Sequence, residues 1–338
     1  MTRFLNDPRD LPHLRLYIQC SVLLIPAAAL LYVPGSFPWW LGLAYIVLWN
    51  LFGDRFTMSY HCTLHRRLFK KDYPALELYL DWVLCPFFGQ TPGTFYVHHM
   101  GMHHIDDNLP DDLSSTMRYQ RDSAFHFLLY YLRFACLIPF ELAAYLWRTR
   151  NMKLLQRFLA GELTYYGAVA ALGYWSLPAT LIVFVFPFVF VRLMMMVGNW
   201  VQHAFIDPDH PDDPYKSSIN TIEPRFNARV FNAGYHIFHH VRKGTHYAEL
   251  ATEFAQNREK YGREDAVVFD GIDLLGIWIL LVTRQHRKLA KYFVRLPGAP
   301  ARSNDEVIAL LQRRLRPIRN WTPASGARVT AAPASSVA

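Results

Sequence analysis

Residues 177–203, LPATLIVFVFPFVFVRLMMMVGNWVQH, decide the fold of this chain. A helix needs about 20 apolar residues to cross the hydrocarbon core of a bilayer, and this stretch exceeds that length with one basic residue, Arg192, inside it. Its end carries Asn199 and His203, which are four positions apart and therefore share one helical face. The stretch predicts a membrane-spanning helix that brings two polar side chains to its end.

The composition supports a membrane protein. Of the 338 residues, 52% are hydrophobic and 18% are charged, whereas soluble domains average about 25% charged residues. Four scattered cysteines without a CxxC pair indicate neither a disulfide framework nor a zinc ribbon. The formal charge of +8 fits loops at anionic headgroups, and no basic run with interleaved aromatics indicates a nucleic-acid partner. Because no secretory leader pattern precedes the first hydrophobic stretch, we expect that stretch to remain as an anchor.

Four stretches are predicted to span the membrane as two hairpins. They are residues 14–33, 38–60, 160–175 and 177–201. A turn at Pro34 and Gly35 joins the first two, and a short corner around Pro178 joins the last two. Residues 75–88, 123–147 and 267–282 are also apolar, but each contains charged residues, so we expect these to lie at the interface or inside the protein.

The sequence therefore predicts an all-α integral membrane protein with four transmembrane helices and a helical cap. Residues 1–317 are expected to form one domain, and residues 318–338, rich in Ala, Pro and Ser, a disordered tail. Residues 304–315 suit a short amphipathic helix. With both termini cytoplasmic, the ends of the two hairpins that carry histidines return to the cytoplasmic side.

Histidines gather in four places where apolar stretches end. The clusters are His61 and His65; His99, His103 and His104; His203; and His236, His239 and His240. In the predicted topology all four lie on one cytoplasmic face. Unpaired polar groups at membrane depth are costly, so we interpret the clusters as a binding site rather than as chance surface histidines.

The spacing of the histidines suits two metal ions. Residues three or four apart share a helical face, so His61 with His65, His99 with His103, and His236 with His239 are each expected to face one region. Adjacent histidines point in directions about 100° apart and can reach two centres. Nine imidazoles exceed the needs of one zinc ion, and imidazole suits iron, so a diiron site is predicted. Asn199 is expected to hold a metal-bound water.

Several neighbours are candidates for the surroundings of the metals. The acids Asp106, Asp107, Asp111 and Asp112 either orient imidazoles or are solvated loop residues. His98 is the ambiguous member of the second cluster. Asp54 and Arg192 lie seven residues before His61 and Asn199, so we expect them to form a buried ion pair beneath the site. The alternatives are pairing of Arg192 with Glu162 and an Arg192 side chain that reaches the interface.

These motifs resemble those of the integral-membrane fatty acid desaturase and hydroxylase superfamily. The pattern HxxxH, HxxxHH, NxxxH and HxxHH appears at His61–His65, His99–His104, Asn199–His203 and His236–His240, so the resemblance covers residues 14–246. It implies that the nine histidines bind two irons and that Asn199 acts through water. The first motif has three residues between its histidines, unlike the four of animal acyl-CoA enzymes, which leaves the acyl carrier open.

The resemblance also implies an activity. Dioxygen and two electrons would let the metals remove hydrogen from an unactivated carbon of a fatty acyl chain, bound as acid, thioester or lipid. No HPGG motif of a fused cytochrome b5 occurs, and the cysteines do not suit an iron–sulfur cluster, so a separate ferredoxin or cytochrome b5 type donor is expected.

Desaturation is the first prediction, with hydroxylation and decarboxylation to a terminal alkene as alternatives. Arg192 favours the last, because a cation near the site can hold a carboxylate. A metal transporter is the non-enzymatic alternative, but we expect transporters to place polar ligands at the bilayer midplane.

Overall fold

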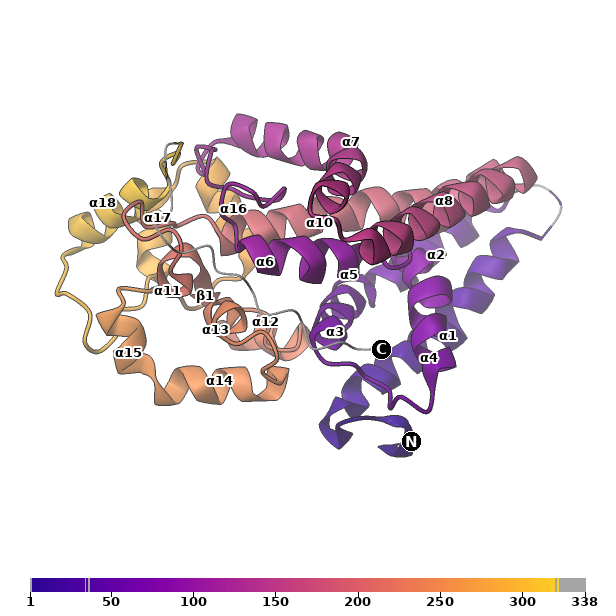
Figure 1. Ribbon diagram of the computed structural model, residues 1–338, viewed down its shortest axis with the longest axis horizontal. Coiled ribbons are helices and arrows are strands. Elements are labelled where there is room, and N and C mark those ends of the chain that lie inside the picture. Colours follow the sequence, from indigo (N-terminus) through magenta and orange to yellow (C-terminus); the bar gives the residue numbers. More distant parts are fainter. Residues whose placement is uncertain (1, 34, 36, 320, 322–338) are drawn as a thin grey trace.

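The computed structural model describes residues 2–33, 35, 37–319 and 321, and these residues are mainly helical (Figure 1). The helices up to His203 are α1 (Leu11–Leu31), α2 (Trp39–Asn50), α3 (Gly53–His65), α4 (Pro74–Tyr79), α5 (Thr94–His98), α6 (His104–Asp106), α7 (Ala124–Arg148), α8 (Met152–Trp175), α9 (Leu177–Thr180) and α10 (Phe186–Gln202). The cap contains α11 (Pro214–Ser217), α12 (Pro224–Arg229), α13 (His236–Val241), α14 (Tyr247–Gln256), α15 (Arg258–Arg263), α16 (Leu274–Val282), α17 (His286–Leu289) and α18 (Asn304–Arg314). Three π-helical segments are η3 (Leu80–Leu84), η5 (His99–His103) and η6 (Leu181–Val185), and four 3-10 turns are η1 (Thr2–Phe4), η2 (Pro8–Asp10), η4 (Cys85–Phe88) and η7 (Ala290–Tyr292).

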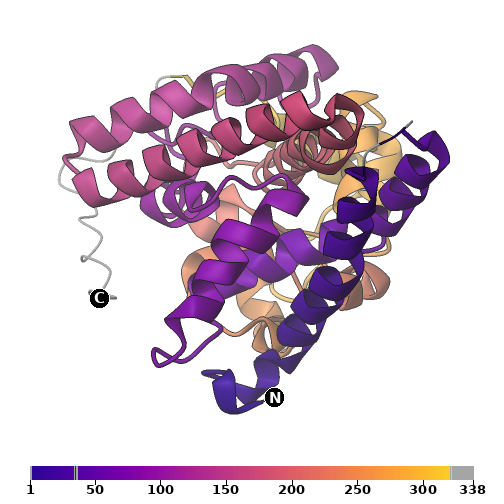
Figure 2. The same ribbon diagram turned by 90° about the vertical axis from the view of Figure 1, so that its right-hand side faces the viewer.

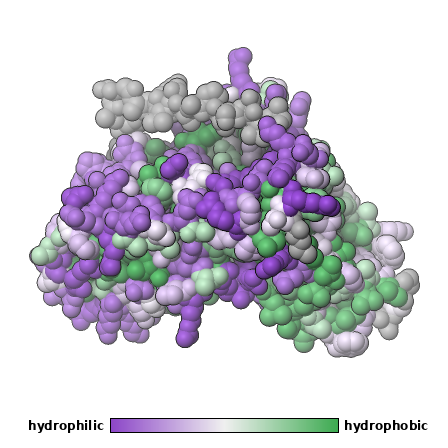
Figure 3. Space-filling model, turned by 90° about the horizontal axis from the view of Figure 1, so that it is seen from below, coloured by the Kyte–Doolittle hydropathy of each residue, from purple (hydrophilic) through white to green (hydrophobic). Residues whose placement is uncertain are grey.

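The long hairpins meet at the end of the molecule away from the cap. The Tyr32 hydroxyl, just after α1, lies 2.8 Å from the Thr180 hydroxyl of α9, and the Tyr32 ring lies 6.0 Å from the ring of Trp175 at the end of α8. Hydrophobic residues gather at this end, whereas hydrophilic residues cover much of the cap (Figure 3). We call it the outer end.

Two predicted spans differ in extent from the helices. The stretch 38–60 is divided, because α2 ends at Asn50 and α3 begins at Gly53. A Cβ atom on Gly53 would lie 2.9 Å from the Trp49 ring, so the glycine allows this ring to fold against the break. The stretch 160–175 is only the later part of α8, which already begins at Met152.

Length and apolar composition single out three candidate spans in the described part of the chain. They are Pro8–Leu31, Ala124–Arg148 and Leu177–Gln202. The first and third coincide with predicted spans. The second is α7, for which we predicted an interfacial or protein-buried position. The 12-residue α2 is too short to qualify alone, and α8 carries charged residues along its first half.

Aromatic packing joins α3 to the segment after α4. The Phe56 and Phe88 rings stack with centroids 3.8 Å apart. Gly89, which follows, has a φ of +68°, and a Cβ atom there would lie 2.3 Å from the Pro187 carbonyl oxygen of α10. Only glycine permits this close approach, because it combines a left-handed conformation with the absence of a side chain.

The predominantly helical fold is confirmed, and the cap adds one short pair of strands to it. Strands β1 (Ile219–Thr221) and β2 (Val267–Phe269) form a short parallel pair. Asn220 of β1 accepts a hydrogen bond from the backbone of Ile237, so the strand supports the helix that carries the last histidines. The predicted amphipathic helix at 304–315 is confirmed as α18. Of the predicted disordered tail, residues 320 and 322–338 lie outside the described residues.

Candidate metal centre

Four separate parts of the chain bring their histidines together at the junction of hairpins and cap. His61 and His65 lie on the last turns of α3, and His203 follows α10. The second cluster lies on η5 and α6, and the fourth on α13. Helix geometry places the side chains within each part, whereas tertiary packing brings the parts together.

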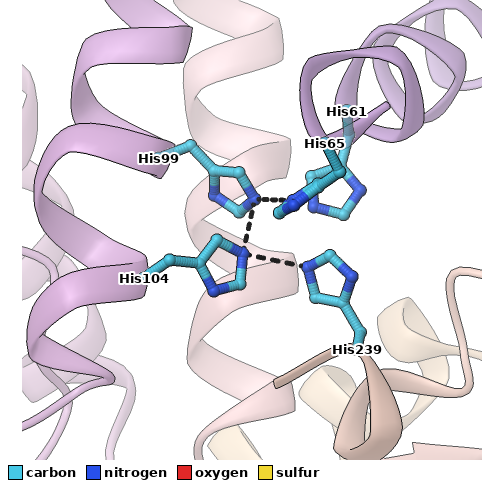
Figure 4. Close-up of side chains that lie close together, drawn as sticks. All are labelled: His61, His65, His99, His104 and His239. Carbon is cyan, nitrogen blue, oxygen red and sulfur yellow. Dashed lines mark hydrogen bonds between the residues drawn. The ribbon is translucent and has the colours of Figure 1, made fainter. Parts of the chain in front are cut away.

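Five imidazoles form the first group (Figure 4). They belong to His61, His65, His99, His104 and His239, and one nitrogen of each lies within 4.8 Å of the others. The Nε2 atom of His99 is 2.9 Å from that of His65 and 3.0 Å from that of His104, which is 3.0 Å from that of His239. These nitrogens point toward one shared space.

Four imidazoles form the second group. Nitrogens of His103, His203 and His240 lie within 4.8 Å of one another. The Nε2 atom of His236 is 3.3 Å from that of His203 and 2.9 Å from that of His240. Each histidine doublet is therefore divided between the two groups, as its sequence spacing predicts.

Two of the predicted same-face pairs stay neighbours but are divided between the groups. The ring centroids of His99 and His103 lie 5.5 Å apart, and those of His236 and His239 lie 5.4 Å apart. His99 groups with His104 rather than His103, because η5 is π-helical and its i to i+5 hydrogen bonds shift the alignment by one residue. His236 approaches His240, four positions along α13, rather than His239.

Three of the four imidazoles of the second group are fixed through their outer nitrogens. The Nδ1 atoms of His103 and His240 lie 2.6 Å from the Asp112 carboxylate and 3.0 Å from the Asp107 carboxylate, and that of His203 lies 3.1 Å from a backbone carbonyl. Such partners orient a ring so that Nε2 faces the metal. In the first group, the Nδ1 atoms of His61, His65 and His104 have no hydrogen-bond partner within the part of the chain that the structure describes.

The loop acids divide by role. Asp107 and Asp112 orient imidazoles, and the pKa of Asp112 is lowered to about 2, because its histidine partners and the Ser114 hydrogen bonds outweigh its burial. Asp106, another of the four candidate acids, contacts no imidazole in the described residues. Burial raises its pKa to about 6. Asp111 is exposed.

Burial keeps most of the grouped imidazoles neutral, which is the form that binds metals. His103 is the exception, because the carboxylates of Asp112 and Asp107 outweigh its burial and raise its pKa. His203 is fully buried and His104 is 3% exposed. Burial, followed by the neighbouring imidazoles, lowers the pKa of His104 and His239 well below the usual value. Neutral rings with converging lone pairs are suited to a cation, since a metal ligand must be deprotonated.

Asn199 and His98 lie at the edge of the groups. The Asn199 amide nitrogen donates to the Ser114 carbonyl at 3.0 Å and to the Tyr130 hydroxyl at 2.7 Å, which leaves its oxygen for a water. The His98 ring packs edge-on against Phe134 at 5.5 Å and belongs to neither group. Tyr130 was not identified from the sequence, because it lies 69 positions from Asn199 and nothing local relates them.

Comparison with known proteins agrees with this geometry. Residues 34–271 match the family model described as fatty acid desaturase, which is more than half of the chain. The chain belongs to the fatty acid desaturase family. Neither a search of curated proteins nor a search of solved structures found a significant match. Membership makes the protein a membrane oxidoreductase of fatty acyl chains.

In this desaturase family member, a cavity of about 910 Å³ adjoins the histidines. His61, Asn199 and His236 line one part of it, and Trp49 and Phe190 line another. Much of the remaining wall is apolar, with four methionines: Met58, Met194, Met195 and Met196. Flexible methionine side chains adapt to varied apolar ligands.

The predicted ion pair between Asp54 and Arg192 is wrong. Asp54 instead binds Arg229 of α12 through two hydrogen bonds, and this pair is nearly half exposed. The Arg192 guanidinium lies 3.9 Å from the centroid of the Phe188 ring. Arg192 is not among the residues lining the cavity. A seven-residue offset places Asp54 and Arg192 two helical turns before the site. It does not specify whether the two helices are oriented so that these side chains face each other.

Proposed function

We propose that this protein is a diiron fatty acyl desaturase that forms a carbon–carbon double bond using dioxygen. The iron ligands are His61, His65, His99, His104 and His239 at one centre and His103, His203, His236 and His240, with Asn199 through water, at the other. The observation that carries the proposal is two converging groups of imidazoles, most of them buried, beside a largely apolar cavity of about 910 Å³. The all-imidazole donor set fits iron, although imidazole also binds zinc and copper.

The bound irons would activate dioxygen for removal of hydrogen from an acyl carbon. The chain's own contribution is to bind and position the substrate. The apolar wall holds the acyl chain without water, and placing a chosen carbon beside His61 and Asn199 sets the position of the double bond. Asp112 and Asp107 keep the imidazoles of the second centre in place.

The proposal includes the setting of the site. Residues 1–317 form one membrane domain with four spans, and the metal site and both termini face the cytoplasm. A separate ferredoxin or cytochrome b5 type protein supplies the electrons. The predominance of basic residues fits this side of a membrane.

The position of Arg192 no longer favours decarboxylation. A carboxylate bound by Arg192 would have to share a cavity with that side chain, and Arg192 does not line the cavity next to the histidines. Hydroxylation has no specific support either. For a transporter, the grouping of ligands at the hairpin–cap junction remains unfavourable.

The test is expression in a host without such enzymes, followed by mass spectrometry of lipids and headspace. We expect acyl chains lighter by two hydrogens, and at least equimolar iron in the purified protein. Hydroxy acids among the products would instead indicate a hydroxylase, and volatile 1-alkenes would indicate a decarboxylase. Purified protein that contains no iron would exclude the diiron proposal.

Filling the cavity is expected to change the chain-length preference. Gly198 lines the cavity, and a Cβ atom there has only the Gln202 side chain, 4.0 Å away, as a neighbour. Gly198→Leu should therefore fold. It should lower turnover of long acyl chains at least about tenfold relative to shorter ones, because each methylene of the acyl chain that the leucine excludes from the cavity loses about 0.8 kcal/mol of burial energy. Gly167→Leu, an exposed glycine on α8, is the control. Competition between chain lengths provides the measurement, and an unchanged ratio would exclude this cavity as the acyl site.

A further inference from the structure

Helix α7 is long and apolar enough to cross a membrane, yet both of its ends lie beside the candidate metal centre. Near its start, the Tyr130 hydroxyl accepts a hydrogen bond from Asn199 at 2.7 Å. Near its end, Leu146 belongs to the same hydrophobic cluster as Met102, which lies between the histidines of η5. A helix that crossed would place its two ends on opposite sides of the hydrocarbon core, which is roughly 30 Å thick. The contacts near both ends of α7 instead lead to segments that carry the histidine groups.

The path of the chain gives an independent argument. The chain leaves the site after His104 and returns to it at His203, and both residues belong to the two adjoining groups. Between them it must cross the membrane an even number of times. Helix α8 and the continuous α9–η6–α10 segment lead to the outer end and back, as the contacts of Tyr32 with Trp175 and Thr180 show. A third crossing by α7 would place His203 on the opposite side of the membrane from His104.

The surface that α7 presents outward is nevertheless apolar. Its exposed large side chains are Phe125, Leu128, Leu129, Leu132, Leu137, Phe140 and Trp147. Phe140 is 74% exposed. The opposite face packs against α8 and α10, and α7 follows one side of the molecule next to α8 (Figure 2). An amphipathic helix with an unpartnered apolar face next to membrane spans is suited to lie in a lipid interface.

We infer that α7 lies along the membrane surface and binds bilayer lipids with its apolar face. Its polar groups fit the depth of lipid headgroups: Arg133 pairs with Glu141 at 2.6 Å on a partly exposed flank. Exposed Arg118 precedes the helix, Arg148 is its last residue and Arg150 follows it, so basic residues at both ends can meet anionic phosphates. The helix thereby attaches the histidine-bearing segments to the membrane.

Side-specific labelling tests the topology. In the full chain with Cys136→Ser, one further cysteine is introduced at a time, as Thr149→Cys after α7, His210→Cys in the cap, or Tyr174→Cys at the outer end. The reaction of the Cys136→Ser parent, which keeps Cys20, Cys62 and Cys85, is subtracted. An impermeant maleimide is added to sealed vesicles before and after permeabilisation. We expect position 149 to react in the same fraction of molecules as position 210, and position 174 in the complementary fraction. Position 149 reacting together with position 174 would show that α7 crosses and would overturn the inference.

Depth measurements identify what covers the apolar face. Nitroxide labels at positions 129, 132 and 140 are compared with one at position 210, using collisions with oxygen and with a water-soluble nickel complex. We expect all three α7 labels at similar depths of about 5–10 Å. The inference would be overturned if the α7 labels collided with the nickel complex as often as the label at position 210. It would also be overturned if a second copy of the chain shielded them from both reagents. Monodisperse elution of each variant provides the folding check.

Discussion

His104→Ala is expected to reduce product formation to background. His104 contacts two other imidazoles of the first group, His99 and His239, from a position that is 3% exposed. Loss of an outer partner of a ligand typically costs about 10–100-fold in metal affinity or activity, and loss of a ligand should cost more than about 100-fold. The second group keeps all of its imidazoles. We therefore expect the purified variant to retain about half of the iron of the parent protein.

Iron content and acyl products of the variant should be measured on the same preparation. His210→Ala is the matched control, because His210 is exposed and belongs to neither imidazole group. It should keep both iron and activity. Full iron content and full turnover after His104→Ala would refute the assignment of the first centre. Elution as a single monodisperse species distinguishes loss of a ligand from misfolding.

Asp112→Asn is expected to weaken the second centre without removing a ligand. The Asp112 carboxylate lies 2.6 Å from Nδ1 of His103 and also accepts hydrogen bonds from Ser114 and the backbone of Asn108. An amide keeps the shape but lacks the charge that holds the ring. The expected loss of iron affinity is about 10–100-fold, with a parallel loss of turnover at limiting iron.

The neighbouring residue provides a control for this substitution. Asp111→Asn removes an exposed carboxylate one position away and should leave iron affinity unchanged. Excess ferrous iron should restore much of the turnover of Asp112→Asn, because the defect is in affinity. A variant that is inactive at every iron concentration but fully loaded, or one with unchanged affinity, would contradict a positioning role for Asp112.

The sequence predicted the histidine-bearing segments better than their internal alignment. Adjacent histidines diverge on any helix, so the division of His103 from His104 follows from sequence alone. The pairing of His99 with His104 does not follow from the sequence. It depends on a π-helical turn, and no residue type in HHMGMHH predicts such a turn. Local periodicity assumes a regular helix, and a single wider turn changes which side chains meet.

Long-range partners were the other limit. Asp54 finds Arg229, which lies 175 positions away, and the arginine expected to pair with it turns toward Phe188 instead. For α7, hydropathy cannot separate a helix that crosses a bilayer from one that lies on it, because both need a similar number of apolar residues. Only the contacts at the two ends of the helix distinguish these cases.

The buried position of the histidine groups also has a kinetic consequence. The imidazoles come from segments as far apart as His61 and His240, and His203 is completely buried at their junction. Because each group draws its rings from both hairpins and cap, release of a bound ion would require several of these segments to move apart. The lifetime of the ion would therefore depend on the rate of that opening as well as on the chelator's strength.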